Sequence, residues 1–521
     1  LYLSQFFKDL YEAGISAAYQ LYMVTKDDRY THKGFYYAQL SKPNLFLEQS
    51  KNYQSLVGSN VPYELKEEYF LISNELQELK NQLYESLDNS VTSDSVIKVN
   101  DQILVLQERL LRIKDSIENN YVSGLLQYES EPSAPPLVKG QLLMEYFVGK
   151  ENIYVFGFDA SGKVVFRRSP YDSELTSHLE TMIAIVSRPP NLNGGDITAQ
   201  MKDFEASSYF LFKKLVSPVL NQFKAEEILL IPDELLTRIP FEALITRAPQ
   251  NDSYKTYRYL VRDYKVRYAL SSNNLKLGSF EKKATKNILG MGYSGVQSSS
   301  QPIRSQFAAL PGTDTEIKFL RARFDGTYYL GMEGSKSKFL EEASDYDIIH
   351  LAIHGKADSI SRFQSSLIFN GQDSLLSTSQ LYLANLNARL AVLSACESGT
   401  GTSEEGEGTF SIARGFAIVG VDNIVMSLWE VNDKITSEQM VSFYNGFLEQ
   451  RNDLNTSLRN MKLGYLEAND SYSCHPYYWA SFIHLGSNMY FDDGGASKNI
   501  MYWLLGFVIV AILILLIWYR N

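Results

Sequence analysis

Two apolar runs in the sequence each lead to a side chain that can do chemistry. His354 lies at the end of the run 347–355 (DIIHLAIHG), and Cys396 lies near the end of the run 389–399 (RLAVLSACESG). Both runs have the length and composition of buried strands that stop at a glycine-containing turn. If the strands are neighbours in a parallel sheet, the imidazole and the thiol emerge together at its carboxyl edge, where open α/β sheets place their sites. A thiol beside an imidazole is the minimum equipment for cysteine-nucleophile chemistry.

The chemistry expected of this pair is attack on a carbonyl carbon. Cysteine needs a neighbouring base or cation to be a thiolate near pH 7, and His354 can serve as that base and later protonate a leaving amine. The oxyanion formed by the attack needs N–H donors, which the backbone amides of Gly355 and Cys396 can supply. Composition alone leaves a simpler alternative open, in which Cys396 is a buried inert thiol and His354 is a core histidine.

Other histidine and cysteine residues compete for these roles. His350 shares a strand face with His354, because four residues are two strand repeats, but it lies deeper in the apolar run. We expect it to be a buried, hydrogen-bonded histidine. Cys474 and His475 are adjacent in a segment expected to be extended, where neighbouring side chains point to opposite faces. We therefore expect both to be structural.

The composition excludes several classes of function. The chain has 521 residues, which predicts two or three domains, and its net charge of -11 argues against nucleic acid as a partner. Its two cysteines form no disulfide framework and are too few for a zinc site. The glycine-rich loop 398–408 (SGTGTSEEGEG) is acidic and lacks the lysine of a phosphate-binding loop. We therefore expect no metal and no cofactor.

The C-terminal region predicts attachment to a membrane. Residues 500–519 (IMYWLLGFVIVAILILLIWY) contain no charged side chain and are long enough to cross a hydrocarbon core of about 30 Å. Trp503 and Trp518 lie near the ends of this segment, as interfacial aromatic residues do. We expect a single-pass anchor there, after a linker at 491–499, with the rest of the chain in the cytoplasm. One basic residue on each side leaves the orientation open.

The order of the expected elements changes near residue 133. Residues 1–133 carry apolar side chains at helical spacing and predict helices, the last two of which form a long antiparallel hairpin. From residue 134 to residue 490, short apolar strands alternate with helices. This alternation predicts an α/β fold with a mainly parallel sheet flanked by helices. The expected strands include 142–148, 153–158, 227–231, 287–292, 348–353, 390–393 and 423–427.

Several motifs follow one another in a fixed order along residues 140–488. They are IPDEL at 231–235, IPFEAL at 239–244, LPGT at 310–313, the histidine run at 347–355, the cysteine run at 387–399, SIAR at 411–414, SLWEVND at 427–433 and HPYYWA at 475–480. In this order they resemble the CHAT domain, a caspase-like cysteine peptidase module of clan CD that is often found behind tetratricopeptide repeats. The helical segment 34–87 is also similar to the segment that precedes this domain in bacterial relatives.

The resemblance implies a catalytic dyad. His354 is then the base, Cys396 the nucleophile, and the amides of Gly355 and Cys396 the oxyanion hole. The sequence departs from the local caspase signature Gln-Ala-Cys-x-Gly, because Ser394 replaces the glutamine and Ser398 replaces the glycine. We therefore expect no caspase-like preference for aspartate.

The resemblance also suggests candidates for a substrate pocket. In related peptidases that cut after arginine or lysine, an acidic residue lines the first specificity pocket. Asp433 and Glu430, which follow the expected strand 423–427, are the candidates for that position. The alternative is that both belong to a solvated acidic loop.

Together these features predict a membrane-anchored, caspase-like cysteine endopeptidase that acts on a protein or peptide substrate. We expect the N-terminal helical segment to bind a regulatory protein and to keep the activity latent until that protein binds. The alternative is a catalytically silent signalling scaffold at the membrane, which keeps the peptidase fold without cleaving.

Overall fold

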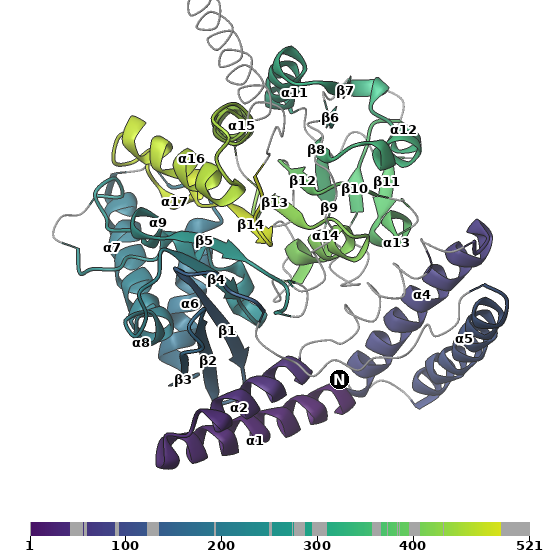
Figure 1. Cartoon of the computed structure of the whole chain (residues 1–521), viewed down its shortest axis with the longest axis horizontal. Helices are drawn as coiled ribbons and strands as arrows, with labels where there is room; N and C mark the ends of the chain where they lie inside the picture. Colours follow the sequence, from purple (N-terminus) through teal and green to yellow (C-terminus); the bar gives the residue numbers. More distant parts are fainter. Residues whose placement is uncertain are drawn as a thin grey trace, which may run out of the picture.

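A mixed sheet of 11 strands, with helices on both faces, forms the body of the molecule (Figure 1). The fold matches the predicted α/β class. The computed structural model describes residues 2–41, 56, 60–88, 93–121, 135–191, 194–249, 253–272, 275, 287–293, 310–356, 366–371, 374–382, 384, 386–394, 407–430 and 432–490.

The strand order in this sheet is β3-β2-β1-β4-β5-β14-β13-β12-β8-β6-β7. Among the described strands, seven pairings of this sheet are parallel and three are antiparallel. The sheet is mixed because β1–β3 form a meander and β14 runs against β13. The strands are β1 Gln141–Val148, β2 Asn152–Asp159, β3 Val164–Pro170, β4 Glu227–Ile231, β5 Lys265–Tyr268, β6 Ile288–Gly292, β7 Gly326–Leu330, β8 Ile348–Ala352, β12 Leu390–Leu393, β13 Asn423–Ser427 and β14 Phe482–Gly486.

The half of the sheet that contains β1–β4 is covered on both faces. On one face, Phe35 of α2 packs edge-to-face on Phe158 of β2, with ring centroids 4.7 Å apart. Ile15 of α1 belongs to the same buried cluster, so the first two helices share a core with the sheet. The other face is covered by α6, α7 and α8. The helices are α1 Tyr2–Thr25, α2 Asp28–Ser41, α6 Ser173–Val186, α7 Gly194–Leu211 and α8 Ser217–Leu220.

The half of the sheet that contains β6, β8, β12 and β13 lies between two layers of helices. Helices α11, α15 and α16 pack on one face, where their apolar side chains meet those of Ile348, Val392 and Val425. Helices α12, α13 and α14 lie on the other face. A second sheet of three short strands lies beside α13 (Figure 1). The elements are α11 Pro311–Arg323, α12 Lys336–Glu342, α13 Thr378–Leu381, α14 Glu407–Ile418, α15 Asp433–Tyr444, α16 Leu454–Ala468, α17 Pro476–Trp479, β9 His354–Lys356, β10 Ser366–Ile368 and β11 Leu375–Ser377.

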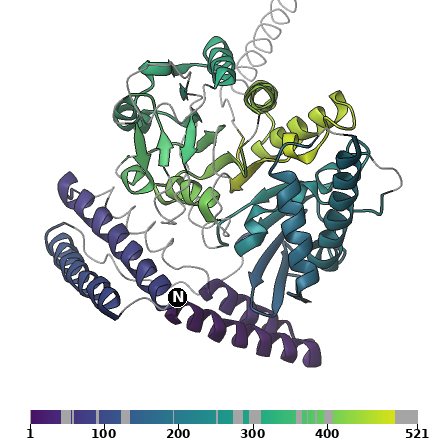
Figure 2. The same ribbon diagram turned by 180° about the vertical axis from the view of Figure 1, so that it is seen from behind.

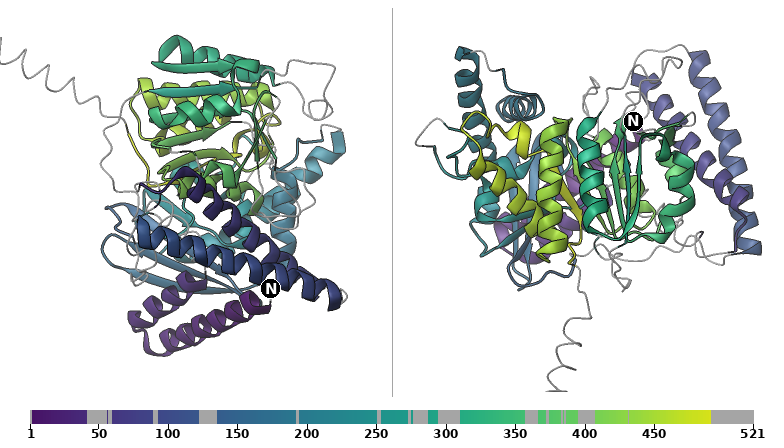
Figure 3. Two further views of the ribbon diagram at one scale, coloured as in Figure 1. Left: turned by 90° about the vertical axis from the view of Figure 1, so that its right-hand side faces the viewer. Right: turned by 90° about the horizontal axis from the view of Figure 1, so that it is seen from above.

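Two long helices form the predicted hairpin beside the body of the molecule. Helices α4 (Tyr63–Asp88) and α5 (Ser93–Asn120) run side by side, as two views show (Figures 2 and 3). The hairpin contacts the body through α4, where the ring of Phe70 lies 5.5 Å from the ring of Tyr382, next to α13. The N-terminal helices are therefore connected to both halves of the sheet.

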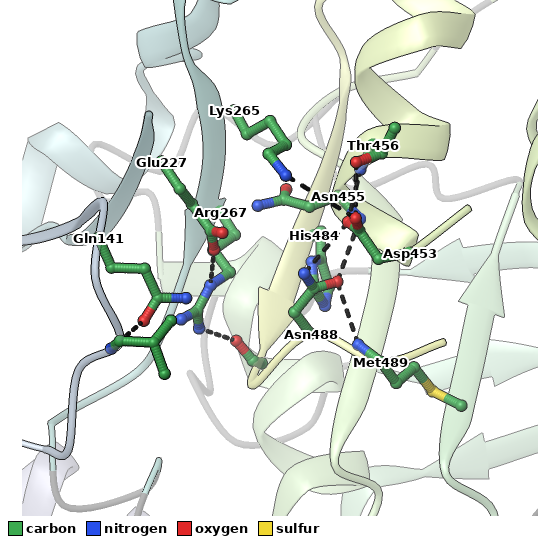
Figure 4. A network of polar contacts seen from close by, with 12 residues as sticks. Gln141, Glu227, Lys265, Arg267, Asp453, Asn455, Thr456, His484, Asn488 and Met489 are labelled. Carbon is green, nitrogen blue, oxygen red and sulfur yellow. Dashed lines mark hydrogen bonds and ion pairs between the residues drawn. The ribbon is translucent and has the colours of Figure 1, made fainter. Parts of the chain in front are cut away.

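A polar network holds the two halves of the sheet together (Figure 4). Within the described strands, β5 and β14 meet at a single residue pair, Tyr268 and Leu485. Beside it, Arg267 donates from Nε to Glu227 Oε1 at 2.5 Å and from Nη1 to the carbonyl of Gly486 at 2.7 Å. Both side chains of this ion pair are buried. The guanidinium thus links β4, β5 and β14, because its fork can donate in several directions at once.

The structure corrects the predicted membrane localisation. Among the described residues, no helix is both long enough and apolar enough to cross a membrane. The longest of these helices, α1, α4 and α5, all contain charged side chains. Residues 500–519, on which the prediction was based, lie outside the described residues.

Candidate active site

His354 lies where the chain leaves the main sheet. Strand β8 ends at Ala352, and after one residue the chain continues as β9, in which His354 is opposite Ile368 of β10. The side chain of His354 is 2% exposed, and its ring lies edge-on to the ring of Tyr293 with centroids 4.8 Å apart. The adjoining Gly355 is buried and lies opposite Leu367. The change of sheet therefore fixes the imidazole at the carboxyl edge of β8.

Cys396 itself lies outside the described residues, but the strand that leads to it is described. Strand β12 runs parallel to β8, and Leu393 lies directly opposite Leu351. His354 is three residues beyond Leu351, and Cys396 is three residues beyond Leu393. Adjacent strands lie about 4.8 Å apart. The register therefore brings the carboxyl ends of β8 and β12 side by side at the same edge of the sheet.

The two acidic candidates for the substrate pocket, Asp433 and Glu430, lie in different environments. Asp433 begins α15 and is half-buried, and it accepts a hydrogen bond from the backbone N–H of Gly312 at the start of α11. Burial raises the pKa of Asp433, the Gly312 hydrogen bond opposes this, the charge of Glu316 raises it further, and the charge of His354 opposes it. Asp433 is thus within electrostatic reach of His354. Glu430 is exposed after the end of β13.

His350 is buried below the candidate site, as predicted. Its Nδ1 lies 3.0 Å from the hydroxyl of Tyr444, and its Nε2 lies 3.1 Å from a carboxylate oxygen of Glu316. All three side chains are enclosed between β8, α11 and α15. The imidazole of His350 is therefore enclosed in the core, with Tyr444 beside one ring nitrogen and Glu316 beside the other, which distinguishes it from His354 at the edge.

Two residues of this region, Tyr293 and Glu316, were not assigned to the site from the sequence. Tyr293 directly follows β6, so it reaches the same edge as His354, and its position after a predicted strand was the available signal. Glu316 lies in α11 with Ile317, a pair that belongs to the series of motifs resembling the CHAT domain, and its proximity to His350 and Asp433 shows that it belongs to this region. Among the described residues, no group of histidine, cysteine, aspartate and glutamate side chains could hold a metal ion.

The second cysteine–histidine couple has a structural role in the described part of the chain. Cys474 is fully buried, and burial raises the pKa of its thiol to about 11, so it is a poor nucleophile. The Nδ1 of His475 accepts a hydrogen bond of 3.1 Å from the backbone N–H of Tyr477 and caps α17.

Two buried histidines, His475 and His484, should make the stability of the fold depend on pH. Burial lowers the pKa of each of these histidines from 6.5 to about 3. Between these values the unfolded chain binds protons that the folded chain does not, so the free energy of unfolding should decrease as the pH falls. The expected slope is up to about 1.4 kcal/mol per pH unit for each histidine.

Equilibrium unfolding in urea between pH 7 and about pH 4 measures this slope. His475→Asn keeps a capping acceptor but does not titrate, so its stability should depend less steeply on pH than that of the wild type. Equal slopes for the two proteins would show that His475 does not contribute.

Comparisons with known proteins place this geometry in context. Residues 205–487 match the family model of the CHAT domain, so the match begins within α7 and ends after β14. The chain is similar to a chain of the Saccharomyces cerevisiae separase–securin complex, with a TM-score of 0.42 and 10% identity over 78% of this chain and 33% of that chain. It is also similar to the Arg-specific cysteine proteinase gingipain R, with a TM-score of 0.33 and 7% identity over 60% of this chain and 74% of that chain. The chain therefore spans about a third of the length of the first of these structures. No curated protein matches it.

Proposed function

This chain belongs to the CHAT domain family, and we propose that it is a cysteine endopeptidase with Cys396 as nucleophile and His354 as general base. The observation that carries the proposal is the parallel register of β8 and β12, in which Leu351 and Leu393 are opposite each other. Each dyad residue lies three positions beyond this pair in the sequence, which supports placing the imidazole and the thiol near each other.

The proposed reaction uses few groups. His354 accepts the thiol proton, the Cys396 thiolate attacks the peptide carbonyl, and the imidazolium then protonates the leaving amine. A thioester to the acyl part of the substrate remains and is hydrolysed by water, with His354 again acting as base. The backbone N–H groups of Gly355 and Cys396 are proposed to stabilise the oxyanion in both steps. The ring contact with Tyr293 keeps the imidazole oriented.

Labelling with an electrophilic peptide tests the nucleophile. A peptide with a carbon electrophile at the scissile position should modify the wild-type chain at Cys396, as intact mass and peptide mapping would show. Cys396→Ala should remove the label, and His354→Ala should slow labelling because the thiolate is no longer supported. Labelling that persists in Cys396→Ala would contradict the assignment of Cys396 as the nucleophile. No labelling of the wild type by any peptide would favour the alternative of a silent scaffold.

We propose that Asp433 sets a preference for cleavage after arginine or lysine. The carboxylate is half-buried, and a substrate cation would compensate the cost of burying it near His354. Asp433→Asn keeps an oxygen that can accept from Gly312 but removes the charge. It should lower kcat/KM for arginine peptides by about tenfold to a hundredfold, because hydrogen bonds between charged groups are the strong ones.

A peptide library with all residues at the scissile position measures this preference. The matched control is Glu430→Gln, because Glu430 is exposed and lies three residues away. If the wild type cuts after apolar residues and never after basic ones, the role of Asp433 is excluded.

We further propose that the helical segment 1–133 binds a regulatory protein and controls the peptidase domain at 134–490. The α4–α5 hairpin reaches the body through Phe70 and Tyr382. Tyr382 follows α13, which packs against α14, and α14 directly follows the segment that contains Cys396. Exposed Leu104 and Leu111 on α5 offer apolar contacts to a partner.

Phe70→Ala tests this coupling. Removing the ring should change the labelling rate of Cys396 by about fivefold or more, because coupling free energies between sites are typically a few kcal/mol. Leu71→Ala is the matched control, since Leu71 is the next residue and is 48% exposed. If Phe70→Ala lowers the melting temperature but leaves the labelling rate equal to that of the control, the hairpin supports the fold without controlling the site.

A further inference from the structure

A cleft of about 770 Å³ opens on the side of α15 that faces α16. Helix α15 lies between α11 and α16 (Figure 1). Its first turns form one wall of the cleft, and the end of α16 with the segment leading to α17 forms the other. The residues used below are Lys434, Glu438, Tyr465, Asp470, Tyr472 and Tyr478, all of which line the cleft. The mechanism proposed above uses none of them.

The chemistry of the lining suits a cation with an aliphatic stem. Tyr465, Tyr472 and Tyr478 present aromatic rings, and tyrosine faces attract ammonium and guanidinium groups. Glu438 and Asp470 add two carboxylates, against one cation from Lys434. Burial raises the pKa of the Tyr465 hydroxyl, and the charges of Cys474, Tyr478, Glu438 and Asp470 add to this in decreasing order. The rings and the carboxylates therefore share one space. Beside it, the ammonium of Lys255 donates to the carbonyl of Asn469 at 2.7 Å.

The cleft lies on the same edge of the sheet as the candidate active site. The parallel strands β8, β12 and β13 all end at this edge, and the antiparallel β14 begins there, with Phe482 opposite Ser427. Along the edge in strand order come His354 after β8, the end of β12, Asp433 after β13 and Tyr478 before β14. The cleft wall formed by α15 begins at Asn432, the residue before Asp433.

The spacing of the strands gives the length of peptide that would reach from the candidate active site to the cleft. Strands β8 and β14 are three positions apart in the sheet, which is about 14 Å at about 4.8 Å per strand. An extended peptide rises about 3.3 Å per residue, so about four to five residues cover this distance. A substrate bound with its scissile residue beside His354 and Asp433 can therefore place a remote side chain in the cleft.

We infer that this cleft is a second specificity subsite, which binds a lysine or arginine side chain of the substrate about four to five residues from the scissile bond. The inference rests on the proposed peptidase function and names its substrate class: extended peptide segments with two separated basic residues. The net charge of -11 of the whole chain favours the approach of such segments.

Binding to an inactive full-length chain tests the subsite apart from catalysis. The probes are fluorescent octapeptides with arginine at the scissile position and one lysine moved through the remaining positions. Norleucine, which has the stem of lysine without its charge, replaces that lysine in the reference peptides. Fluorescence anisotropy with the Cys396→Ala chain should show one position at which lysine binds about tenfold more tightly than norleucine.

Glu438→Gln in the same background should reduce this discrimination to about threefold or less, because the carboxylate facing the cation is lost. Glu449→Gln is the matched control: it is also an exposed glutamate, it pairs with Arg323, and it lies outside the cleft. The control should keep the full discrimination, since exposed ion pairs contribute little.

The outcomes separate the two proposals. Equal binding of lysine and norleucine at every position, or discrimination unchanged by Glu438→Gln, would overturn the subsite, even if the wild-type chain cleaves peptides. Discrimination that depends on Glu438 in a chain whose intact Cys396 cleaves no peptide would overturn the peptidase and leave the cleft as a peptide-binding site.

Discussion

Replacing Cys396 with alanine should lower kcat/KM for peptide cleavage by about 10⁴-fold or more, because the thioester cannot form without the thiol. Cys474 cannot take over, since its side chain is fully buried and burial raises the pKa of its thiol to about 11. The residual rate of the variant would report only binding and the oxyanion donors. The measurement is steady-state cleavage of a peptide that labels the wild type.

A matched comparison uses the two histidines in and just after β8, His350 and His354. His354→Ala should lower kcat/KM of the folded variant by about 10²-fold to 10⁴-fold, the usual range for a general base. His350→Gln should instead lower the free energy of unfolding by about 1–3 kcal/mol, because Tyr444 and Glu316 lose a buried partner. The kcat/KM of the folded His350 variant should stay within about threefold of the wild type.

This comparison distinguishes a site at the sheet edge from one inside the core. If His350→Gln is inactive at unchanged stability while His354→Ala cleaves normally, the base is His350 and the register argument fails. If Cys396→Ala keeps its activity, the nucleophile lies elsewhere and no cysteine dyad operates.

The strands that lead to the candidate site were predictable because their signals are local. The runs 227–231, 390–393 and 423–427 coincide with β4, β12 and β13. Each is short, apolar and ended by a turn, which is the pattern of a strand buried on both faces. Strand β5 was not predicted, since Lys265 and Arg267 break its apolar pattern. Arg267 is buried only because Glu227 pairs with it from 40 positions away in the sequence.

The candidate site was predictable only in part, because sequence patterns report local structure and the site also depends on contacts between distant residues. His354 follows an apolar run, so its position at an edge could be inferred from that run alone. The hydrogen bond that Gly312 donates to Asp433 joins residues separated by 121 positions, and no periodicity indicates it. The cleft beside α15 is likewise assembled from segments on different helices. Local patterns predict elements, whereas the environment of a side chain depends on how the elements pack.

A second large effect is expected at a buried ion pair between α16 and the core. Lys462 Nζ lies 2.7 Å from Glu242 Oε1, and the two side chains are 1% and 2% exposed. The hydroxyl of Tyr268 donates to the other oxygen of Glu242. Lys462→Met leaves a buried carboxylate without its cation and should lower the free energy of unfolding by about 3–5 kcal/mol.

A double-mutant cycle separates the charge from the packing. Glu242→Gln combined with Lys462→Met removes both charges, keeps an acceptor for Tyr268, and should recover most of the lost stability. Arg258→Met is the control, because its pair with Asp263 is substantially exposed and should contribute less than about 1 kcal/mol. Urea unfolding of the four proteins and the control measures these differences.

The same variants test whether α16 holds the cleft in place. Helix α16 runs directly into the segment with Asp470 and Tyr472, and Lys462 is the residue that fastens its buried side to Glu242. If the ion pair positions this wall, Lys462→Met should weaken the lysine discrimination of the cleft under conditions where the chain is still folded, and the double variant should restore it. Discrimination that stays constant through the cycle, while stability changes as expected, would mean that the packing of α16 alone sets the cleft.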